Sequence, residues 1–267
     1  MTQLPTYFLS HGGGPWPWMR DQFGQAYDAL DASLRDIPRQ IGGKPKAVLV
    51  ITAHWEGREF MISSGTTPPM IYDYGGFPPH TYAIRYDAPG DPALAARVQA
   101  LLGEAGHTAV LDDARGFDHG TFSALYPVFP EADVPIVQLS LRQGLDPAEH
   151  VAVGRALAAL RREGVLIVGS GLSYHNLRAF NAAGAAASHA FDDWLRATMA
   201  LPPQERMAAL LEWERAPAAR QAHPREEHLL PLMVALGAAE RDVATVVYHE
   251  EEFFGALAVS SFRFDGA

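Results

Sequence analysis

Three histidines each follow, within a few residues, a short apolar run with the β-branched composition of a buried strand. In open α/β sheets, ligands bind in the crevice outside the carboxyl ends of the strands. Imidazoles at three such ends could therefore meet although they lie far apart in sequence, and imidazole suits both metal binding and proton transfer near neutral pH. The three are His11, after Tyr7–Leu9, His54, after Ala47–Ile51, and His175, after Val165–Val168.

Glycines accompany two of these histidines. The stretch Gly169–Leu177 reads GSGLSYHNL, and its two glycines are expected to let the backbone turn sharply and deliver His175. His11 is followed by three glycines and a proline, which predict a loop where backbone or ligand approaches closely. Of the three histidines, His11 and His54 are the strongest candidates, because each ends an apolar strand where small residues keep access open.

A fourth histidine, His228, lies in the sequence REEHLLP at the start of a helix predicted over Glu226–Leu236. Two histidines and one carboxylate commonly hold non-heme iron with open positions. By this reasoning the third ligand beside His11 and His54 is His228, Glu226 or Glu227. Alternatively, the acidic pair only favours the helix start, where negative charge is stabilising. His223 is a candidate for orienting a ligand from behind.

His119 directly follows Asp118, and the pair predicts an Asp–His hydrogen bond that would fix the imidazole tautomer. The interpretation is substrate contact or acid–base work, with bracing of the loop as the alternative. His80 is a weaker candidate because it lies in an irregular region. A structural role is expected for the histidines in ordinary helix or strand contexts, which are His107, His150, His189 and His249.

Composition limits the partners and the kind of metal site. The chain has 267 residues, 48% of them hydrophobic, and a formal net charge of −10, which disfavours nucleic acid and anionic membranes as partners. No apolar run approaches the roughly 18–20 residues of a membrane span, and the start of the chain lacks the pattern of a signal peptide, so we expect a cytoplasmic protein. With no cysteine, a metal would have only nitrogen and oxygen ligands.

Strand patterns alternate with helix patterns, which indicates an α/β fold. We expect a single domain over residues 1–267, with a central mixed sheet flanked by helices and the active site at the carboxyl ends of the strands. Helices are expected over Met19–Leu34, Asp91–Ala105 and Pro147–Arg162, and a short strand over Tyr82–Tyr86. A hairpin is expected between Lys46–Ala53 and Phe60–Ile62, and the irregular, aromatic-rich region Gly65–His80 is interpreted as a flap over the site.

Other common chemistries lack their motifs. The nucleophile elbow G-x-S-x-G is absent, which leaves the HGGG sequence after the first strand a weak match to an esterase oxyanion hole. Neither a dinucleotide-binding G-x-G-x-x-G, a phosphate-binding P-loop nor an H-E-x-x-H zinc motif occurs.

Five motifs in order, SHGGGP, ITAHW, FDHGTF, GSGLSYHNL and REEHLLPL, resemble the DOPA-dioxygenase-type branch of the class III extradiol ring-cleaving dioxygenases. The catalytic subunit of protocatechuate 4,5-dioxygenase is a more distant relative of this branch. The resemblance implies one metal ion held by His11, His54 and His228. Fe(II) is expected in the active enzyme, and Zn(II) is a further possible occupant, to which His175 could add a fourth ligand.

The resemblance also implies roles for other side chains. A catechol would present two adjacent hydroxyls to the metal, beside dioxygen, and ring opening would give a semialdehyde. His175 is the expected base and acid, and His119 is expected to hold a substrate hydroxyl. The expected walls for the aromatic ring are Trp16, Trp55, Tyr74 and Phe77.

Two other functions remain open at this point. One is a zinc-dependent hydrolase that uses the same histidines to activate water. The other is a non-catalytic interaction module of the Memo type, against which the presence of all four histidines argues. For the dioxygenase, the expected partners are a small catechol and O2, with the chain a monomer or small homo-oligomer.

Overall fold

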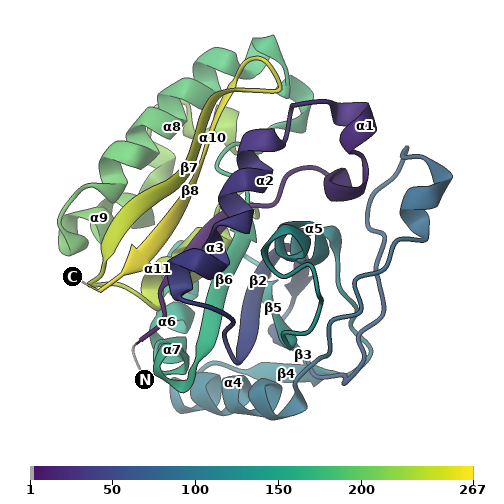
Figure 1. Ribbon diagram of the computed structural model, residues 1–267. Helices are drawn as coiled ribbons and strands as arrows, with labels where there is room; N and C mark the ends of the chain where they lie inside the picture. Colours follow the sequence, from purple (N-terminus) through teal and green to yellow (C-terminus); the bar gives the residue numbers. More distant parts are fainter. Residues whose placement is uncertain (1–2, 267) are drawn as a thin grey trace.

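The apolar, β-branched runs of the sequence form one eight-stranded mixed sheet in a computed structural model that describes residues 3–266 (Figure 1). The strand order is β4-β3-β5-β2-β6-β1-β8-β7. The strands are β1 (Thr6–Ser10), β2 (Ala47–Gly57), β3 (Phe60–Ser63), β4 (Ala109–Asp112), β5 (Ile136–Arg142), β6 (Val165–Gly171), β7 (Val243–Phe253) and β8 (Leu257–Asp265).

The centre of the sheet is parallel. Strand β6 lies between β1 and β2 and is parallel to both, and β2 is also parallel to β5. These central strands are buried nearly throughout, as expected where helices cover both faces of a parallel sheet. Antiparallel pairing occurs outside them, between β3 and β5 and between β8 and both β1 and β7. The predicted α/β fold with a mixed sheet is therefore confirmed.

Helices cover both faces of the sheet (Figure 1). One face carries α4 (Pro92–Glu104), α6 (Pro147–Leu157), α8 (Ala185–Met199) and α11 (Leu230–Gly237), and the other carries α2 (Asp28–Arg35) and α5 (His119–Val128). Short helices complete the fold: α1 (Arg20–Phe23), α3 (Ile37–Ile41), α7 (Leu160–Glu163), α9 (Pro203–Leu211) and α10 (Ala219–Ala222). Among residues 3–266, no helix is both long and apolar enough to cross a membrane.

Several helices and turns differ from the expectation. The helix predicted over Met19–Leu34 is interrupted where Gly24 takes a φ of +54° and ends α1 before α2 begins. The helix predicted over Pro147–Arg162 divides into α6 and α7. By contrast, α4 begins as predicted, with the Asp91 carboxylate accepting a 2.9 Å hydrogen bond from the backbone of Leu94.

The hairpin predicted between β2 and β3 is wrong, because β5 lies between them in the sheet. Ile62 of β3 pairs with Leu139 of β5, while β2 continues to Gly57, which pairs with Arg142 at the far end of β5. The β2 strand is thus longer than predicted and uses its own edge to bind β5, which leaves no edge for β3.

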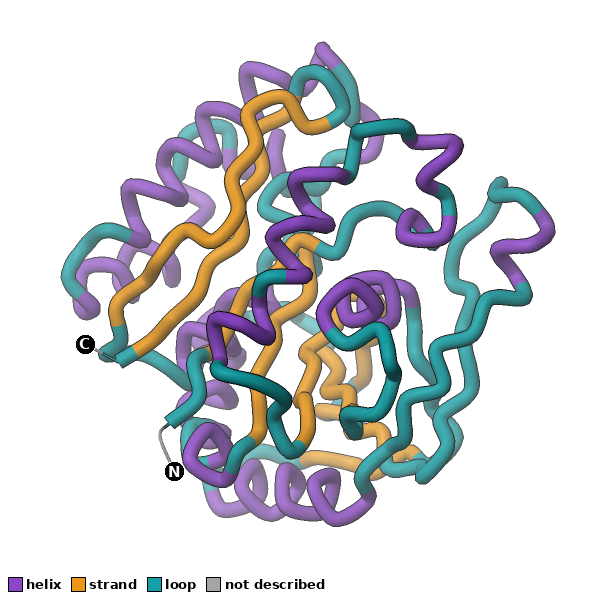
Figure 2. Tube along the Cα trace, viewed as in Figure 1, coloured by secondary structure: helices purple, strands orange, loops and turns teal. Residues whose placement is uncertain are grey.

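The connection between β3 and α4 is almost entirely loop, with one short helical turn at Pro79–Tyr82 (Figure 2). The strand predicted over Tyr82–Tyr86 does not form here. Side-chain hydroxyls take the place of a strand partner, because Tyr72 donates to the backbone oxygen of Ile84 and Tyr86 donates to that of Phe129. The irregular character expected for the region before it is confirmed.

Candidate active site

Three neighbouring parallel strands bring three of the predicted histidines to one edge of the sheet. His11 directly follows β1, and its backbone N–H donates a 3.0 Å hydrogen bond to the oxygen of Gly171 at the end of β6. His175 lies four residues beyond that end. His54 lies inside β2, where the register against β5 shifts between Ile51 and Glu56. His54 thus lies within an irregular stretch of the strand, and irregularities of this kind commonly re-aim side chains next to active sites.

His228 lies in the turn before α11 rather than inside the predicted helix. Its backbone oxygen accepts a 3.1 Å hydrogen bond from Leu172, and a Cβ on Gly171 would lie only 2.1 Å from that oxygen. A Cβ on Gly169 would likewise lie 2.3 Å from the backbone oxygen of Pro231. Strand β6 continues through both glycines, and neither has a positive φ, so the sharp turn expected at them is wrong. These glycines instead let the segment carrying His228 lie against β6.

The structure brings His11, His54 and His228 together through their Nε2 atoms. The Nε2 atoms of His11 and His54 are 3.2 Å apart, and those of His54 and His228 are 3.3 Å apart. Nitrogen ligands 2.0–2.1 Å from one tetrahedral cation are separated by about 3.3–3.4 Å. The spacing and the all-imidazole donor set therefore fit a single divalent transition-metal ion.

The tautomer of His11 follows from its hydrogen bonds. Its Nδ1 lies 3.1 Å from the hydroxyl oxygen of Ser170, and that hydroxyl donates its own proton to the backbone oxygen of Gly120. Ser170 must therefore accept from His11, which places the imidazole proton on Nδ1. The lone pair on Nε2 then faces the centre, as a metal ligand requires.

Asp73 orients two imidazoles at once. Its Oδ1 lies 2.9 Å from both the backbone nitrogen and Nδ1 of His119, and its Oδ2 lies 3.3 Å from Nδ1 of His54. The predicted Asp118–His119 bond is wrong, because the Asp118 carboxylate accepts from Arg115 and Thr52 and caps α5 instead. Sequence analysis missed Asp73, whose only signal was its place in the aromatic loop.

Glu227 likewise orients two imidazoles, on the other side of the centre. Its Oε1 accepts from Nδ1 of His228 at 2.9 Å and from Nδ1 of His175 at 3.0 Å. The two rings stack, with centroids 3.3 Å apart and planes 16° from parallel. Since both Nδ1 atoms carry protons, both Nε2 atoms are left free to face the cavity.

The electrostatics of the cluster favour neutral imidazoles. Burial, followed by the neighbouring imidazoles, lowers the pKa of His11 and of His228 and lowers that of His54 to about 3. Burial alone would raise the pKa of Asp73, but its hydrogen bond and attraction to His119 lower it to about 2. Near neutral pH, ionised Asp73 therefore faces an unprotonated His54 imidazole, and an unprotonated imidazole is the form that binds metal.

The cluster opens into a cavity of about 810 Å³. Tyr74 and Phe77 line it, as predicted, but Trp16 and Trp55 do not. The Trp16 ring is 1% exposed, because its Nε1–H donates a 2.7 Å hydrogen bond to the backbone oxygen of His11 and its face stacks on Tyr27. Trp16 therefore supports the glycine loop from beneath, and its predicted role as a wall is wrong.

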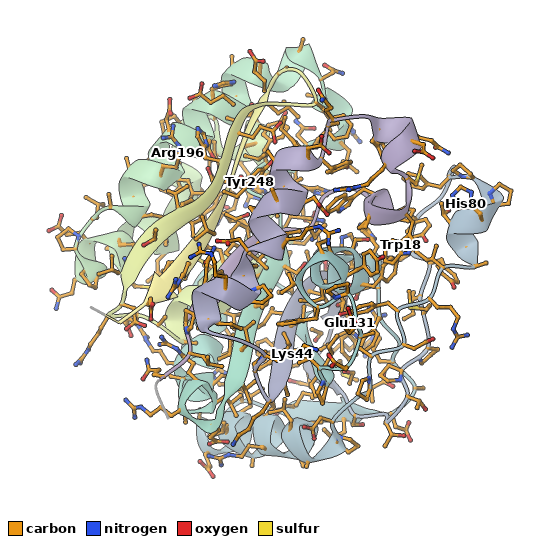
Figure 3. All side chains as sticks on the ribbon, viewed as in Figure 1. Trp18, Lys44, His80, Glu131, Arg196 and Tyr248 are labelled. Atoms are coloured by element: carbon orange, nitrogen blue, oxygen red, sulfur yellow. The ribbon has the colours of Figure 1, made fainter. Side chains whose placement is uncertain are left out.

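Three other residues singled out from the sequence do not line the cavity. Trp55 packs under the guanidinium of Arg115, 4.7 Å from its ring centre. His80 lies on the outer tip of its loop, away from the centre (Figure 3). His223 is fully buried behind the cavity and donates through Nε2 to the backbone oxygen of Ser173 at 2.9 Å. Sequence analysis missed the apolar residues that complete the walls, which are Phe23, Tyr27, Leu172, Leu177, Phe180 and Phe254.

Comparison with known proteins agrees with this geometry. Residues 5–262 match the family described as the catalytic LigB subunit of aromatic ring-opening dioxygenase. The chain belongs to the LigB family. A LigB relative in Portulaca grandiflora, named 4,5-DOPA dioxygenase extradiol, is 41% identical, covering 97% of this chain and 95% of its own. The Escherichia coli protein of the same name is 35% identical, covering 97% and 94%.

One further relative and one solved structure are also similar to this chain. The dioxygenase TasH of Hapsidospora irregularis is 38% identical, covering 96% of this chain and 84% of its own. The crystal structure of an uncharacterized protein from Escherichia coli K12 superposes with a TM-score of 0.78 at 29% identity, covering 98% of this chain and all of that one. This LigB protein is thus an extradiol ring-opening dioxygenase, and nothing in the comparisons favours the hydrolase or the interaction module. LigB dioxygenases depend on a metal, and the histidine cluster could hold one.

Proposed function

We propose that residues 1–267 form one catalytic domain that cleaves a DOPA-like catechol with O2, using Fe(II) held by His11, His54 and His228. The observation that carries the proposal is the common centre of the three Nε2 atoms, at separations of 3.2 and 3.3 Å. Zn(II) would fit the same nitrogen donors and is the expected competitor during purification. Bound iron would acidify the catechol hydroxyls and bring both substrates together.

His175 is the proposed general base and acid of this site. Its Nδ1 proton is held by Glu227, so Nε2 can take a proton from a substrate hydroxyl and return it later. Stacking on His228 at 3.3 Å keeps that nitrogen beside the proposed iron ligands. An imidazole in this position can serve both steps because one ring nitrogen can first accept a proton and later donate it.

His119 and the aromatic loop are proposed to position the substrate. Asp73 holds the Nδ1 proton of His119, which leaves Nε2 to accept a hydrogen bond from a catechol hydroxyl. Tyr74 and Phe77 pack edge to face, with ring centroids 5.3 Å apart, and form an apolar wall for the aromatic ring. Ring opening beside the two hydroxyls would release a semialdehyde.

Oxygen uptake tests the function directly. Protein loaded anaerobically with Fe(II) is mixed with a panel of catechols in air, with metal-free and Zn(II)-loaded protein as controls. We expect O2 consumption and a yellow ring-cleavage product only with iron. Protein that holds one Fe(II) per chain and consumes no O2 with any catechol would contradict the proposal.

A further inference from the structure

An ion pair lies at the rim of the cavity, outside the histidine cluster. The guanidinium of Arg225 meets the carboxylate of Glu56 side by side, with nitrogen–oxygen distances of 2.5 and 2.6 Å. Both residues line the cavity, and within residues 3–266 Arg225 is the only lysine or arginine that does. Their side chains are 54% and 23% exposed, so a bound molecule can reach both charges.

Neither charge is saturated by the other. A guanidinium has five N–H donors, and the pair with Glu56 uses two of them. A carboxylate has about four lone-pair sites, so Glu56 also keeps acceptors free. Arg225 therefore offers donors to a carboxylate, and Glu56 offers acceptors to an ammonium group. An α-amino acid head group carries both charges and matches the pair without adding net charge.

The pair is one side chain away from the proposed centre. Nη1 of Arg225 lies 3.5 Å from Oε2 of Glu227, whose other oxygen holds His175 and His228. A ring whose hydroxyls lie at the imidazoles can therefore extend a substituent along Glu227 to the rim. Glu227 would repel the carboxylate of such a substituent, which leaves Arg225 as its place to bind.

One side of the cavity is apolar, which restricts where a charged substituent can lie. Phe23, Phe180, Leu177 and Phe254 line the other part of the cavity. Leu177 is 71% exposed and Phe254 38% exposed, so this side offers an ionic group no partner of either sign. A charged tail that left water here would lose hydration without compensation.

We propose that the Arg225–Glu56 pair selects catechols that carry an amino-acid-like tail, with Arg225 binding the carboxylate and Glu56 the ammonium group. This inference rests on the proposed function, because it concerns the substrate of the same cavity. It adds a specificity site formed by residues that take no part in holding the metal or moving protons.

The test measures a ratio of substrates rather than a single rate. Arg225→Gln and Glu56→Gln are compared with the wild-type enzyme, all loaded with Fe(II). The substrates are L-DOPA, 3,4-dihydroxyphenylpropionate, dopamine and 4-methylcatechol, which present both charges, the carboxylate, the ammonium group and neither. A matched control is Arg155→Gln, because Arg155 forms a similar pair with Glu240, at 2.7 Å for both contacts, away from the cavity.

We expect Arg225→Gln to lower kcat/KM for L-DOPA relative to 4-methylcatechol by about tenfold, mainly through KM, as befits one charge-assisted contact. Glu56→Gln should lower kcat/KM for L-DOPA relative to kcat/KM for 3,4-dihydroxyphenylpropionate several-fold. Arg155→Gln should leave both ratios unchanged. Because each ratio is internal to one variant, a general loss through Glu227 cancels. Dissociation constants measured without O2 should change in the same proportion.

Two failures are distinguishable. Ratios in both cavity variants within twofold of the wild-type ratios would overturn the specificity site while leaving ring cleavage in place. If the wild-type enzyme cleaves none of the four compounds, including 4-methylcatechol, the proposed function itself is wrong and the specificity site falls with it.

Discussion

Two carboxylates, Asp73 and Glu227, each contact the Nδ1 atoms of two imidazoles at the centre of this LigB protein. Each therefore joins a proposed metal ligand to a residue proposed for substrate chemistry. The ring orientations are coupled as a result, because a shift of one carboxylate moves two imidazoles. The affinity of the site for metal and the turnover of substrate should therefore both depend on Asp73 and Glu227, which are assigned no contact with metal or substrate.

Replacing Asp73 tests this arrangement. In Asp73→Asn the amide oxygen can still accept a hydrogen bond from one imidazole, but the NH2 group presents a donor to the other. We expect metal affinity to fall about 10- to 100-fold, measured by competition with a chelator. Asp87→Asn is the control, since Asp87 pairs with Arg85 on the surface. Equal affinities in the two variants would remove Asp73 from the support of the site.

Metal binding and proton transfer should separate at two other positions. His175→Gln is expected to keep the metal and lose at least about 10²-fold in kcat, the usual size of a general-base effect. His54→Ala is expected to lose the metal. Elemental analysis and oxygen uptake on both variants give the comparison. Full turnover in His175→Gln, or one metal per chain in His54→Ala, would contradict the assigned roles.

The sequence predicted the histidines better than their partners. An apolar run ending in His11 or His54 carries information about position, because the carboxyl ends of parallel strands share one edge. Asp73 carried no such signal. It reaches His54 and His119 only because an irregular loop folds back over the strand ends, and loop paths depend on contacts that are not local in sequence.

At the scale of elements, close contact between β6 and the turn before α11 depends on Gly171. A Cβ there would lie 2.1 Å from the backbone oxygen of His228 and 2.9 Å from the Phe8 ring. Backbone cannot rotate away as a side chain can, so the segment carrying His228 would have to shift. The glycine therefore contributes to the site without presenting any group to it.

We expect Gly171→Ala to destabilise the fold by roughly 1–3 kcal/mol, as overpacking does, and to lower metal content because His228 moves. Gly103→Ala is the matched control, because nothing lies within 4 Å of its Cβ and it lies in α4. It should stabilise the protein by up to about 1 kcal/mol. Urea unfolding and elemental analysis measure both effects. A Gly171→Ala variant as stable and metal-rich as the wild type would refute the close-contact argument.

Element types were predictable where a pattern was long, and pairings were not. The cap at Asp91 and the strand that carries His54 follow from local chemistry, so both were found. The position of β5 between β2 and β3 depends on which edge of the sheet each strand meets, and no local pattern records that. Likewise, the glycines after Val168 predicted a turn, whereas the structure uses them for contact between strand and turn.

At the scale of the whole molecule, buried neutral histidines make stability depend on pH. His223 is fully buried, and this burial lowers its pKa to about 4. The ordinary pKa of a histidine is about 6.5. Between pH 6.5 and 4, residue 223 is therefore protonated in the unfolded chain and unprotonated in the folded protein. The free energy of unfolding is therefore highest above pH 6.5 and falls as the pH drops towards 4.

His223→Gln should flatten that dependence. The metal-free variant is expected to lose less stability on acidification than the metal-free wild type, with a difference in slope of at most about 1.4 kcal/mol per pH unit. Urea unfolding between pH 4 and 7 measures both slopes. His11, His54 and His228 are present in both proteins, so the difference in slope reports the burial of His223 together with its repulsion of His228. Equal slopes in the two proteins would show that the burial of His223 does not make the free energy of unfolding depend on pH.

The imidazoles that converge at the strand ends come from positions 11, 54, 119, 175 and 228 of the chain. A polypeptide still being translated lacks the last of these until most of the sheet has been synthesised. Free metal would therefore meet only partial, weakly binding sets of donors on the ribosome. Metallation should be a late event that follows closure of the fold, and a bound ion should mark chains that have finished folding.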